Sequence, residues 1–510
     1  MNSKWFRELF RRRVYIILML VVQLAFIVYI VIHGGMASSI LNYSFRAISV
    51  FVVFYIVSSP AKTEYKMIWM LLVLTFPIFG GFLYLIFNFQ RSTAKFSQKL
   101  GKIEQNTRPD FKLIEDCPTQ AVNDCGEYKN LINYLDDTLG FPVYKNTAAK
   151  YLSPGEEKFK YMLEELEKAQ SYIFLEYFIV ESGEMWDSIL EILKRKAKEG
   201  VEVRMIYDDL GCFLLLPNDY PKYLEQFGIK CKIFNKFRPT LSSLQNNRDH
   251  RKIAVIDGKV AFTGGINLAD EYINKKDKHG YWKDASVMLT GDAAWSFTVM
   301  FLQMWEVNTG EHEDISIFLP AFNDDERRAD DGYIQPYADS PVDRENVGES
   351  VYLNIISAAK DYLYIATPYL VIDESLLTAL KLAAKNGVDV RIITPKNKDK
   401  WFVHEATRSY YKELIDSGIK IYEFRGFIHS KIFIADGKIG TVGTVNLDFR
   451  SLYLHFECGA VLYGYTAIDD AYNDYISTLE KSDEITLDNC KSNIFRRALR
   501  EFLRMFAPLM

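Results

Sequence analysis

Two segments of the chain carry the same chemically active side chains at the same spacing. The first segment contains His250, Lys252 and Asp257. The equivalents in the second are His429, Lys431 and Asp436, and each segment is followed by a small pair and an asparagine, Gly264-Gly265-Ile266-Asn267 and Gly443-Thr444-Val445-Asn446. Unrelated core histidines beside solvated lysines would not repeat these trailing residues. We therefore predict that the two segments supply the halves of one catalytic site.

The spacing of histidine and lysine indicates phosphate chemistry. Residues two apart on a strand face the same side, so His250 and Lys252 point together, as do His429 and Lys431. An ammonium can neutralise the nonbridging oxygens of a phosphodiester while a neutral imidazole attacks phosphorus. The second imidazole can protonate the leaving alkoxide and then take a proton from the incoming alcohol. We therefore expect transfer through a phosphohistidine, and these residues alone do not rank the two histidines as nucleophile.

Other residues at matched positions are expected to support this chemistry. Asn267, Asn446 and the Thr444 hydroxyl are predicted to donate hydrogen bonds to the phosphate. Asp284 and Glu457 each lie seven residues before a matched glycine, and we interpret them as carboxylates that orient the histidines. For each acid alone, an ordinary salt bridge is the competing interpretation. No metal-ligand spacing is present in the sequence, and we predict neither a metal nor a cofactor.

The two motif aspartates are expected to be structural. Asp257 and Asp436 each begin an Asp-Gly-Lys sequence that is typical of a hairpin turn at a strand end. We therefore include them in the predicted catalytic motif but expect them to hold the turn.

The elements around the motifs form an internal repeat. Strand and helix patterns alternate in two rounds, which predicts an α/β fold. Gly200 and Gly387 are interpreted as helix C-caps before matched strands. The predicted regions are a membrane region at 1–90, a juxtamembrane connector at 91–150, a first repeat at 151–322, a linker at 323–346, and a second repeat with a C-terminal amphipathic helix at 347–510.

The first 90 residues are strongly apolar. Val14 to Ile32 contains no charge and is long enough for a transmembrane helix, and a signal peptide is the competing interpretation. Two further apolar segments follow, at 40–59 with Arg46 and at 67–87 with Pro77; either could span or be re-entrant. Basic residues flank the region at both ends, so we expect a multi-pass protein of the cell membrane whose catalytic region lies in the cytoplasm.

The C-terminal segment is amphipathic. Phe495, Leu499, Phe502 and Phe506 recur near helical spacing among four arginines. We expect this helix either to lie on an anionic bilayer or to pack on its own domain.

The composition excludes some other functions. The net charge of −5 and the scattered basic residues argue against a nucleic-acid partner. The six cysteines form no CxxC pair, and in so long a chain they do not constitute a disulfide framework. A homo-oligomer is compatible with the sequence.

The duplicated HxKxxxxD motif with its trailing asparagine resembles that of the phospholipase D superfamily, from about residue 150 to the end. The segment Phe76-Pro77-Ile78-Phe79-Gly80-Gly81, the stretch from Asn267 to Tyr272 and the end of the chain resemble bacterial cardiolipin synthases. The resemblance implies two phospholipase D-like repeats packed as a pseudo-dimer around one active site, preceded by transmembrane helices. It also implies that phosphatidylglycerol donates its phosphatidyl group to His250, that glycerol leaves, and that a second phosphatidylglycerol accepts the group to give cardiolipin, with His429 as acid.

Two other functions compete with this one. A membrane-bound phospholipase D-type hydrolase would use the same histidines with water as acceptor. A non-catalytic membrane scaffold would tolerate loss of either histidine. The walls that select the acceptor are predicted at Tyr177, Tyr207, Tyr369 and 209–217.

Overall fold

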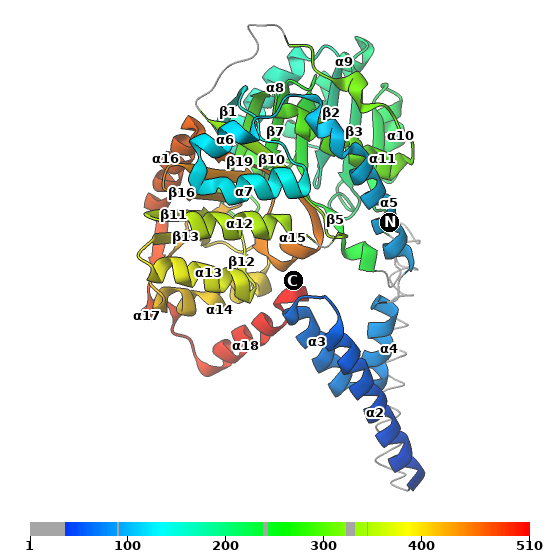
Figure 1. The fold of residues 1–510 in the computed structure, drawn as a ribbon, viewed down its shortest axis with the longest axis vertical. Coiled ribbons are helices and arrows are strands. Elements are labelled where there is room, and N and C mark those ends of the chain that lie inside the picture. The colour runs from blue at the N-terminus through cyan, green and yellow to red at the C-terminus, as the bar shows by residue number, and fades with distance from the viewer. Residues whose placement is uncertain (1–35, 89–90, 238–242, 323–331, 344, 510) are drawn as a thin grey trace. The chain divides into compact units, whose positions relative to one another are not determined.

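The computed structural model describes residues 36–88, 91–237, 243–322, 332–343 and 345–509 (Figure 1). The chain forms two compact units. One consists of the described residues within Met1–Ser97, Phe237–Asn247 and Met505–Leu509, and the other of those within Gln98–Lys236 and Arg248–Arg504. The predicted helix at 14–32 lies outside the described residues.

The first unit contains three apolar helices, α2 (Met36–Ser58), α3 (Thr63–Thr75) and α4 (Pro77–Asn88). The chain leaves the helical conformation at Phe76 (φ −128°, ψ 78°), because proline disfavours a helical residue before it. The Trp69 ring then lies 5.2 Å from Tyr84 and 5.9 Å from Phe87, so α4 runs back along α3. Gly80 permits this close approach, since a Cβ there would lie 2.5 Å from the Leu72 carbonyl oxygen.

This arrangement changes the expectation for the membrane region. The apolar segment at 67–87 is two short helices that fold back on each other. Within the part of the chain that the structure describes, no helix combines the length and hydropathy needed to cross a bilayer. The expected transmembrane helices are therefore not confirmed there.

The connector, whose fold the sequence did not predict, is helical. Its elements are α5 (Arg91–Thr107), η1 (Arg108–Leu113), α6 (Pro118–Asp124), η2 (Gly126–Tyr128), α7 (Lys129–Asn133) and η3 (Tyr134–Leu139).

Each repeat contains a mixed β-sheet. In spatial order, the first sheet consists of β1 (Thr147–Leu152), β9 (Ser286–Gly291), β7 (Val260–Gly264), β6 (Lys252–Ile256), β2 (Tyr172–Tyr177), β3 (Glu202–Asp208) and β4 (Lys230–Phe234). The second consists of β10 (Tyr333–Asp339), β19 (His455–Tyr463), β17 (Ile439–Gly443), β16 (Ile432–Ala435), β11 (Tyr362–Ala366), β13 (Asp389–Pro395), β14 (Lys420–Phe424) and β20 (Ser482–Ile485). Seven strands in each sheet, from β1 to β4 and from β10 to β14, follow the same order and directions. The predicted α/β fold with two equivalent repeats is therefore confirmed, and β10 lies within the range expected to be a linker.

Helices cover these sheets (Figure 1). The first repeat contains α8 (Gly155–Lys168), α9 (Glu184–Lys198), α10 (Tyr220–Glu225), α11 (Ala294–Thr309), η5 (Asp270–Ile273) and η6 (Ile315–Phe318). The second contains α12 (Val347–Ala358), α13 (Glu374–Lys385), α14 (Trp401–Asp416), α15 (Phe449–Tyr453), α16 (Thr466–Glu480), α17 (Leu487–Cys490) and α18 (Ile494–Met505). Gly200 and Gly387 follow α9 and α13 with φ of 95° and 98°, a backbone conformation that favours glycine.

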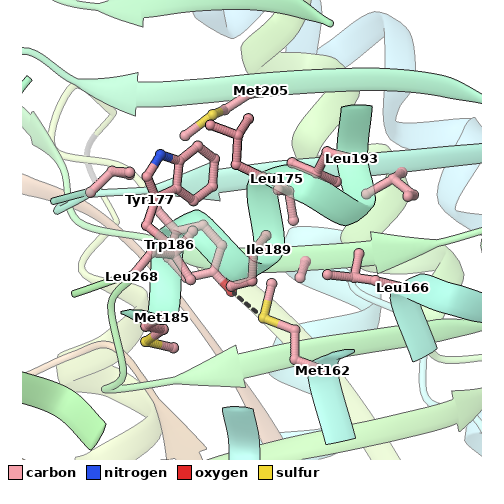
Figure 2. Packing of buried hydrophobic residues seen from close by; sticks show 14 of the residues in the cluster. Met162, Leu166, Leu175, Tyr177, Met185, Trp186, Ile189, Leu193, Met205 and Leu268 are labelled. Carbon is pink, nitrogen blue, oxygen red and sulfur yellow. Dashed lines mark hydrogen bonds between the residues drawn. The ribbon is translucent and has the colours of Figure 1, made fainter. Parts of the chain in front are cut away.

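The central strand β2 is buried on both faces. Leu175 and Tyr177 pack against α8 and α9 in the core that Figure 2 shows, which includes Trp186. Phe174 points the other way and stacks on Phe301 of α11, with 4.6 Å between ring centroids. Helices on both faces explain why this strand is apolar without alternation.

Candidate active site

Short parallel strands join the two repeats beside the motif histidines. In one junction, β5 (Arg248–Asp249) pairs with the start of β19, and the His250 amide donates to the Phe456 carbonyl at 2.9 Å. In the other, β8 (Trp282–Lys283) pairs with β15 (Phe427–Ile428), and the His429 amide donates to the Lys283 carbonyl at 2.7 Å. In each junction the next residue on one strand is a motif histidine, and the next on the other is a predicted orienting acid.

This register crosses the acids between the repeats. Nδ1 of His250 lies 2.9 Å from both carboxylate oxygens of Glu457, and Nδ1 of His429 lies 2.7 Å from Oδ2 of Asp284. Each histidine of one repeat is therefore held by the acid of the other. A carboxylate accepts a hydrogen bond from Nδ1–H, which leaves the lone pair of a neutral imidazole on Nε2.

Burial keeps both imidazoles neutral. It lowers the pKa of His250 well below its usual value, and the charge of Lys252 adds to the effect. Burial and Lys431 lower the pKa of His429 to about 4, although Asp284 opposes the shift. Burial also raises the pKa of Glu457, while Lys252 and the Thr444 hydroxyl favour its carboxylate form. A neutral imidazole with a fixed Nδ1–H is the form that a nucleophile requires.

The motif lysines lie directly behind the histidines. Nζ of Lys252 donates to the His250 carbonyl at 2.5 Å, and Nζ of Lys431 lies 2.8 Å from Nδ1 of His429. Burial lowers the pKa of Lys252 to about 8 and that of Lys431 to about 7. Nζ of Lys431 therefore lies beside the imidazole of its motif, whereas Nζ of Lys252 contacts the backbone of its histidine.

Both motif histidines line one cavity of about 450 Å³, which residues of both repeats enclose. The predicted Asn267 and Asn446 also line it. The other lining residues are Phe178, Ile179, Leu210, Arg248, Glu271, Tyr272, Lys278, His279, Trp282, Tyr369, Val371, Asp399, Lys400, Val403, Asp448, Arg450 and His455. Arginines and lysines suit an anionic phosphate, and the aliphatic and aromatic residues suit an apolar part of a substrate.

The predicted phosphate donors have different surroundings. Oδ1 of Asn446 is buried without a hydrogen-bond partner among the described residues, but this oxygen is an acceptor, so only the Nδ2 group of Asn446 can donate to a phosphate. Asn267 is already engaged, because its Oδ1 accepts from the Ile179 amide at 3.0 Å and its Nδ2 donates to the Tyr272 hydroxyl at 2.7 Å. Thr444 donates to Oε2 of Glu457 at 2.5 Å and therefore orients the acid.

Gly265, the counterpart of Thr444, leaves room for the other acid. A Cβ at this position would lie 2.0 Å from Oδ1 of Asp284. Asp284 instead accepts the Ala285 amide at 2.8 Å and the Trp282 indole N–H at 3.4 Å. The residue after the first motif's glycine is therefore small because Asp284 fills the space beside it.

The motif aspartates hold turns outside the cavity lining. Asp257 accepts the amides of residues 170, 171 and 172 at 2.7 to 2.8 Å. Asp436 accepts those of residues 360, 361 and 362 at 2.8 to 2.9 Å. Both residues have left-handed backbones, with φ of 52° and 55°. In both repeats the aspartate thus connects the motif strand to the start of the central strand.

The predicted cavity walls are partly wrong. Tyr369 lines the cavity, as does Leu210 from the predicted 209–217 stretch. Tyr177 and Tyr207 instead belong to the core of the first repeat, where the Tyr177 hydroxyl accepts from Lys158 of α8 and the Tyr207 ring lies 6.5 Å from that of Tyr220 in α10.

His455 lies in the site although it was not predicted from the sequence. Its ring lines the cavity at 5.4 Å from the His250 ring, and its Nδ1 lies 3.7 Å from Oε1 of Glu457. The signal was its position two residues before Glu457, which places both side chains on one face of the strand. Trp282 has the same position relative to Asp284.

Comparison with known proteins identifies the family. A family described as cardiolipin synthase, PLD-like domain, matches residues 162–305 and 352–479, and one described as phospholipase D-nuclease N-terminal matches 47–87. A cardiolipin synthase of Alkalihalophilus pseudofirmus is 36% identical over 468 residues, covering 90% of this chain and 91% of its own length. One of Geobacillus sp. is also 36% identical, over 90% of this chain and 92% of its own length. A crystal structure of phosphatidylserine synthase from Haemophilus influenzae shares the fold, with a TM-score of 0.57 and 15% identity over 75% of this chain and 98% of that one. The chain therefore belongs to the cardiolipin synthase family with phospholipase D-like domains.

Proposed function

We propose that this protein transfers a phosphatidyl group from one phosphatidylglycerol to another, giving cardiolipin and glycerol. The observation that carries this proposal is the pair of neutral histidines in one cavity, each held through Nδ1 by a carboxylate of the other repeat. The similarity to the cardiolipin synthases supports the choice of substrate.

His250 is the proposed nucleophile. Its Nε2 lone pair attacks phosphorus while the bond to the glycerol oxygen breaks, and His429 gives its proton to that oxygen. The negative phosphate beside His429 favours the imidazolium that this step needs, and Asp284 stabilises it. A phosphohistidine and free glycerol result.

The second half of the reaction reverses these roles. The neutral His429 takes the proton from a glycerol hydroxyl of a second phosphatidylglycerol, and the resulting oxygen attacks phosphorus. The phosphorus–nitrogen bond breaks, which restores neutral His250 and leaves the protonated His429 for the next cycle. We infer that the Nδ2 group of Asn446, together with Lys400 and Arg450 of the lining, donates hydrogen bonds to the phosphate oxygens.

We also propose that α18 contacts the bilayer through its apolar face. Arg496, which is half-exposed, and Arg500, which is buried, both pair with Glu405 of α14, and Arg504 pairs with Glu413 at 3.0 Å. Ile494, Phe495 and Phe502 are 77%, 82% and 56% exposed. The helix α14, to which these ion pairs attach α18, also supplies Val403 to the cavity lining. A lipid surface next to α14 and α18 is consistent with the proposed location at the cell membrane, with a cytoplasmic catalytic region.

The test is incubation of the purified full-length protein in liposomes with labelled phosphatidylglycerol, followed by separation of the lipids. Cardiolipin with stoichiometric glycerol is expected, and the His250→Ala variant should form neither. Phosphatidic acid alone would identify the hydrolase instead. No turnover would contradict both activities.

A further inference from the structure

Three potential metal ligands meet at one side of the catalytic cavity. Oε1 of Glu457 lies 2.9 Å from Nδ1 of His250 and 3.7 Å from Nδ1 of His455. One ligand atom of each of the three lies within 4.8 Å of the others. Their side chains are 0%, 9% and 11% exposed for Glu457, His250 and His455. The group is thus compact and largely shielded from water.

The proposed reaction leaves one member of this group without a role. Nδ1 of His455 is buried and has no hydrogen-bond partner in the described part of the chain. The matched position in the other half is Trp282, whose indole N–H donates to Asp284 and has no lone pair for a metal. The donor set therefore exists in one half of the site only.

We propose that His250, His455 and Glu457 bind a divalent transition ion of the Zn²⁺ class, and that the bound ion switches the enzyme off. Two imidazoles and a carboxylate form a donor set that suits Zn²⁺ and leaves a fourth position open. Metal–ligand distances of about 2.1 Å place tetrahedral ligand atoms roughly 3.4 Å apart. The observed separations of 2.9 and 3.7 Å bracket this spacing.

The inhibition follows from the tautomer of His250. An ion bound at Nδ1 replaces the hydrogen that Glu457 otherwise accepts, so the neutral ring carries its hydrogen on Nε2. Nε2 then has no lone pair with which to attack phosphorus. No covalent bond to carbon or phosphorus changes in this step. The metal site itself is independent of the proposed function, whereas the inhibition rests on it.

Binding is tested with Co²⁺, whose d–d absorption reports a protein ligand set, on the full-length wild type without a histidine tag. We expect one ion per chain. His455→Asn should weaken binding by about tenfold or more, since loss of a metal ligand costs at least as much as loss of its supporting partner. The matched control is His279→Asn, which removes another imidazole from the same cavity lining and should leave the affinity unchanged. No absorption in the wild type, or an unchanged affinity in His455→Asn, would overturn the site.

Inhibition is tested by measuring the rate of glycerol release in excess chelator and in buffered micromolar Zn²⁺. For each variant, the rate in Zn²⁺ is divided by the rate of the same variant in chelator. We expect at least about a tenfold decrease with Zn²⁺ in the wild type and a ratio near one in His455→Asn. Co²⁺ binding with an unchanged wild-type ratio would refute the inhibitory role. Failure of the wild type to release glycerol even in chelator would contradict the proposed function, while the absorption spectrum still decides the site.

Discussion

Glu457→Gln is the sharpest test of whether the acid of one repeat orients the histidine of the other. It keeps the shape of the side chain and removes its charge. The Thr444 hydroxyl accepts from the Cys458 amide and donates to Oε2 of Glu457. In the variant this hydroxyl should hold the amide oxygen and turn the amide NH₂ toward Nδ1 of His250. Both oxygens of Glu457 lie 2.9 Å from Nδ1, but an NH₂ group in place of Oε1 can only donate, so it favours the tautomer in which Nδ1 accepts and the hydrogen lies on Nε2.

The expected loss is large because the variant stabilises the wrong tautomer of the nucleophile. Replacement of a buried acid behind a catalytic histidine by its amide typically lowers kcat about 10⁴-fold, which corresponds to roughly 5.4 kcal/mol of barrier. We therefore expect a loss of about 10³- to 10⁴-fold in glycerol release. Thr444→Val in the same background frees the amide to rotate, so part of the activity should return.

The assay is glycerol release from phosphatidylglycerol in mixed micelles, with thermal unfolding measured on the same samples. A loss smaller than tenfold in a folded Glu457→Gln protein would refute the role of Glu457 in setting the tautomer. Asp284→Asn is the matched variant for the other half, because the Ala285 amide holds Oδ1 and leaves Nδ2 toward His429.

Three other predictions concern packing, pH and the lipid surface. Gly265→Ala should destabilise the fold by about 1–3 kcal/mol and disturb Asp284, since its Cβ would lie 2.0 Å from Oδ1 of that acid. The control in thermal unfolding is Gly101→Ala, where a Cβ meets nothing within 4 Å. The free energy of unfolding should decrease as the pH falls from about 6.5 to about 4. In this window the unfolded chain protonates His429, whereas the folded protein, in which the pKa of His429 is lower, does not. The same slope of unfolding free energy against pH in His429→Gln would contradict this. Phe495→Asp should leave the unfolding temperature unchanged but reduce turnover on vesicles more than turnover in micelles. The control is Ile317→Asp, at a site 68% exposed in the first repeat, which should change neither turnover. Equal losses in vesicles and micelles would argue against contact of α18 with the bilayer.

The repeat was predictable because local sequence patterns specify it. Matched spacing revealed the two motifs, and strand geometry predicted that each lysine lies on the side of its histidine. The Asp-Gly-Lys sequences likewise indicated the turns that Asp257 and Asp436 now hold. These features depend on neighbours in the chain, so a single sequence contains them.

The membrane region was less predictable for a similar physical reason. Hydropathy identifies the apolar segment at 67–87 but says nothing of its direction. The direction follows from Pro77, which ends α3, and from Gly80, which lets the two short helices approach. The sequence left a re-entrant segment open as one alternative, and the contact of Trp69 with Tyr84 and Phe87 shows that the two helices reverse.

The sequence by itself determined which residues could carry out the chemistry: two histidines, two lysines and two acids at matched positions. The tertiary structure decided which acid serves which histidine, because the β5–β19 and β8–β15 pairs cross between repeats. It also separated the buried amide of Asn446 from the engaged Asn267, and it brought His455 beside His250. Spacing along a strand specifies only which face a side chain occupies, whereas a partner some two hundred residues away is specified by strand pairing, which is a property of the folded chain.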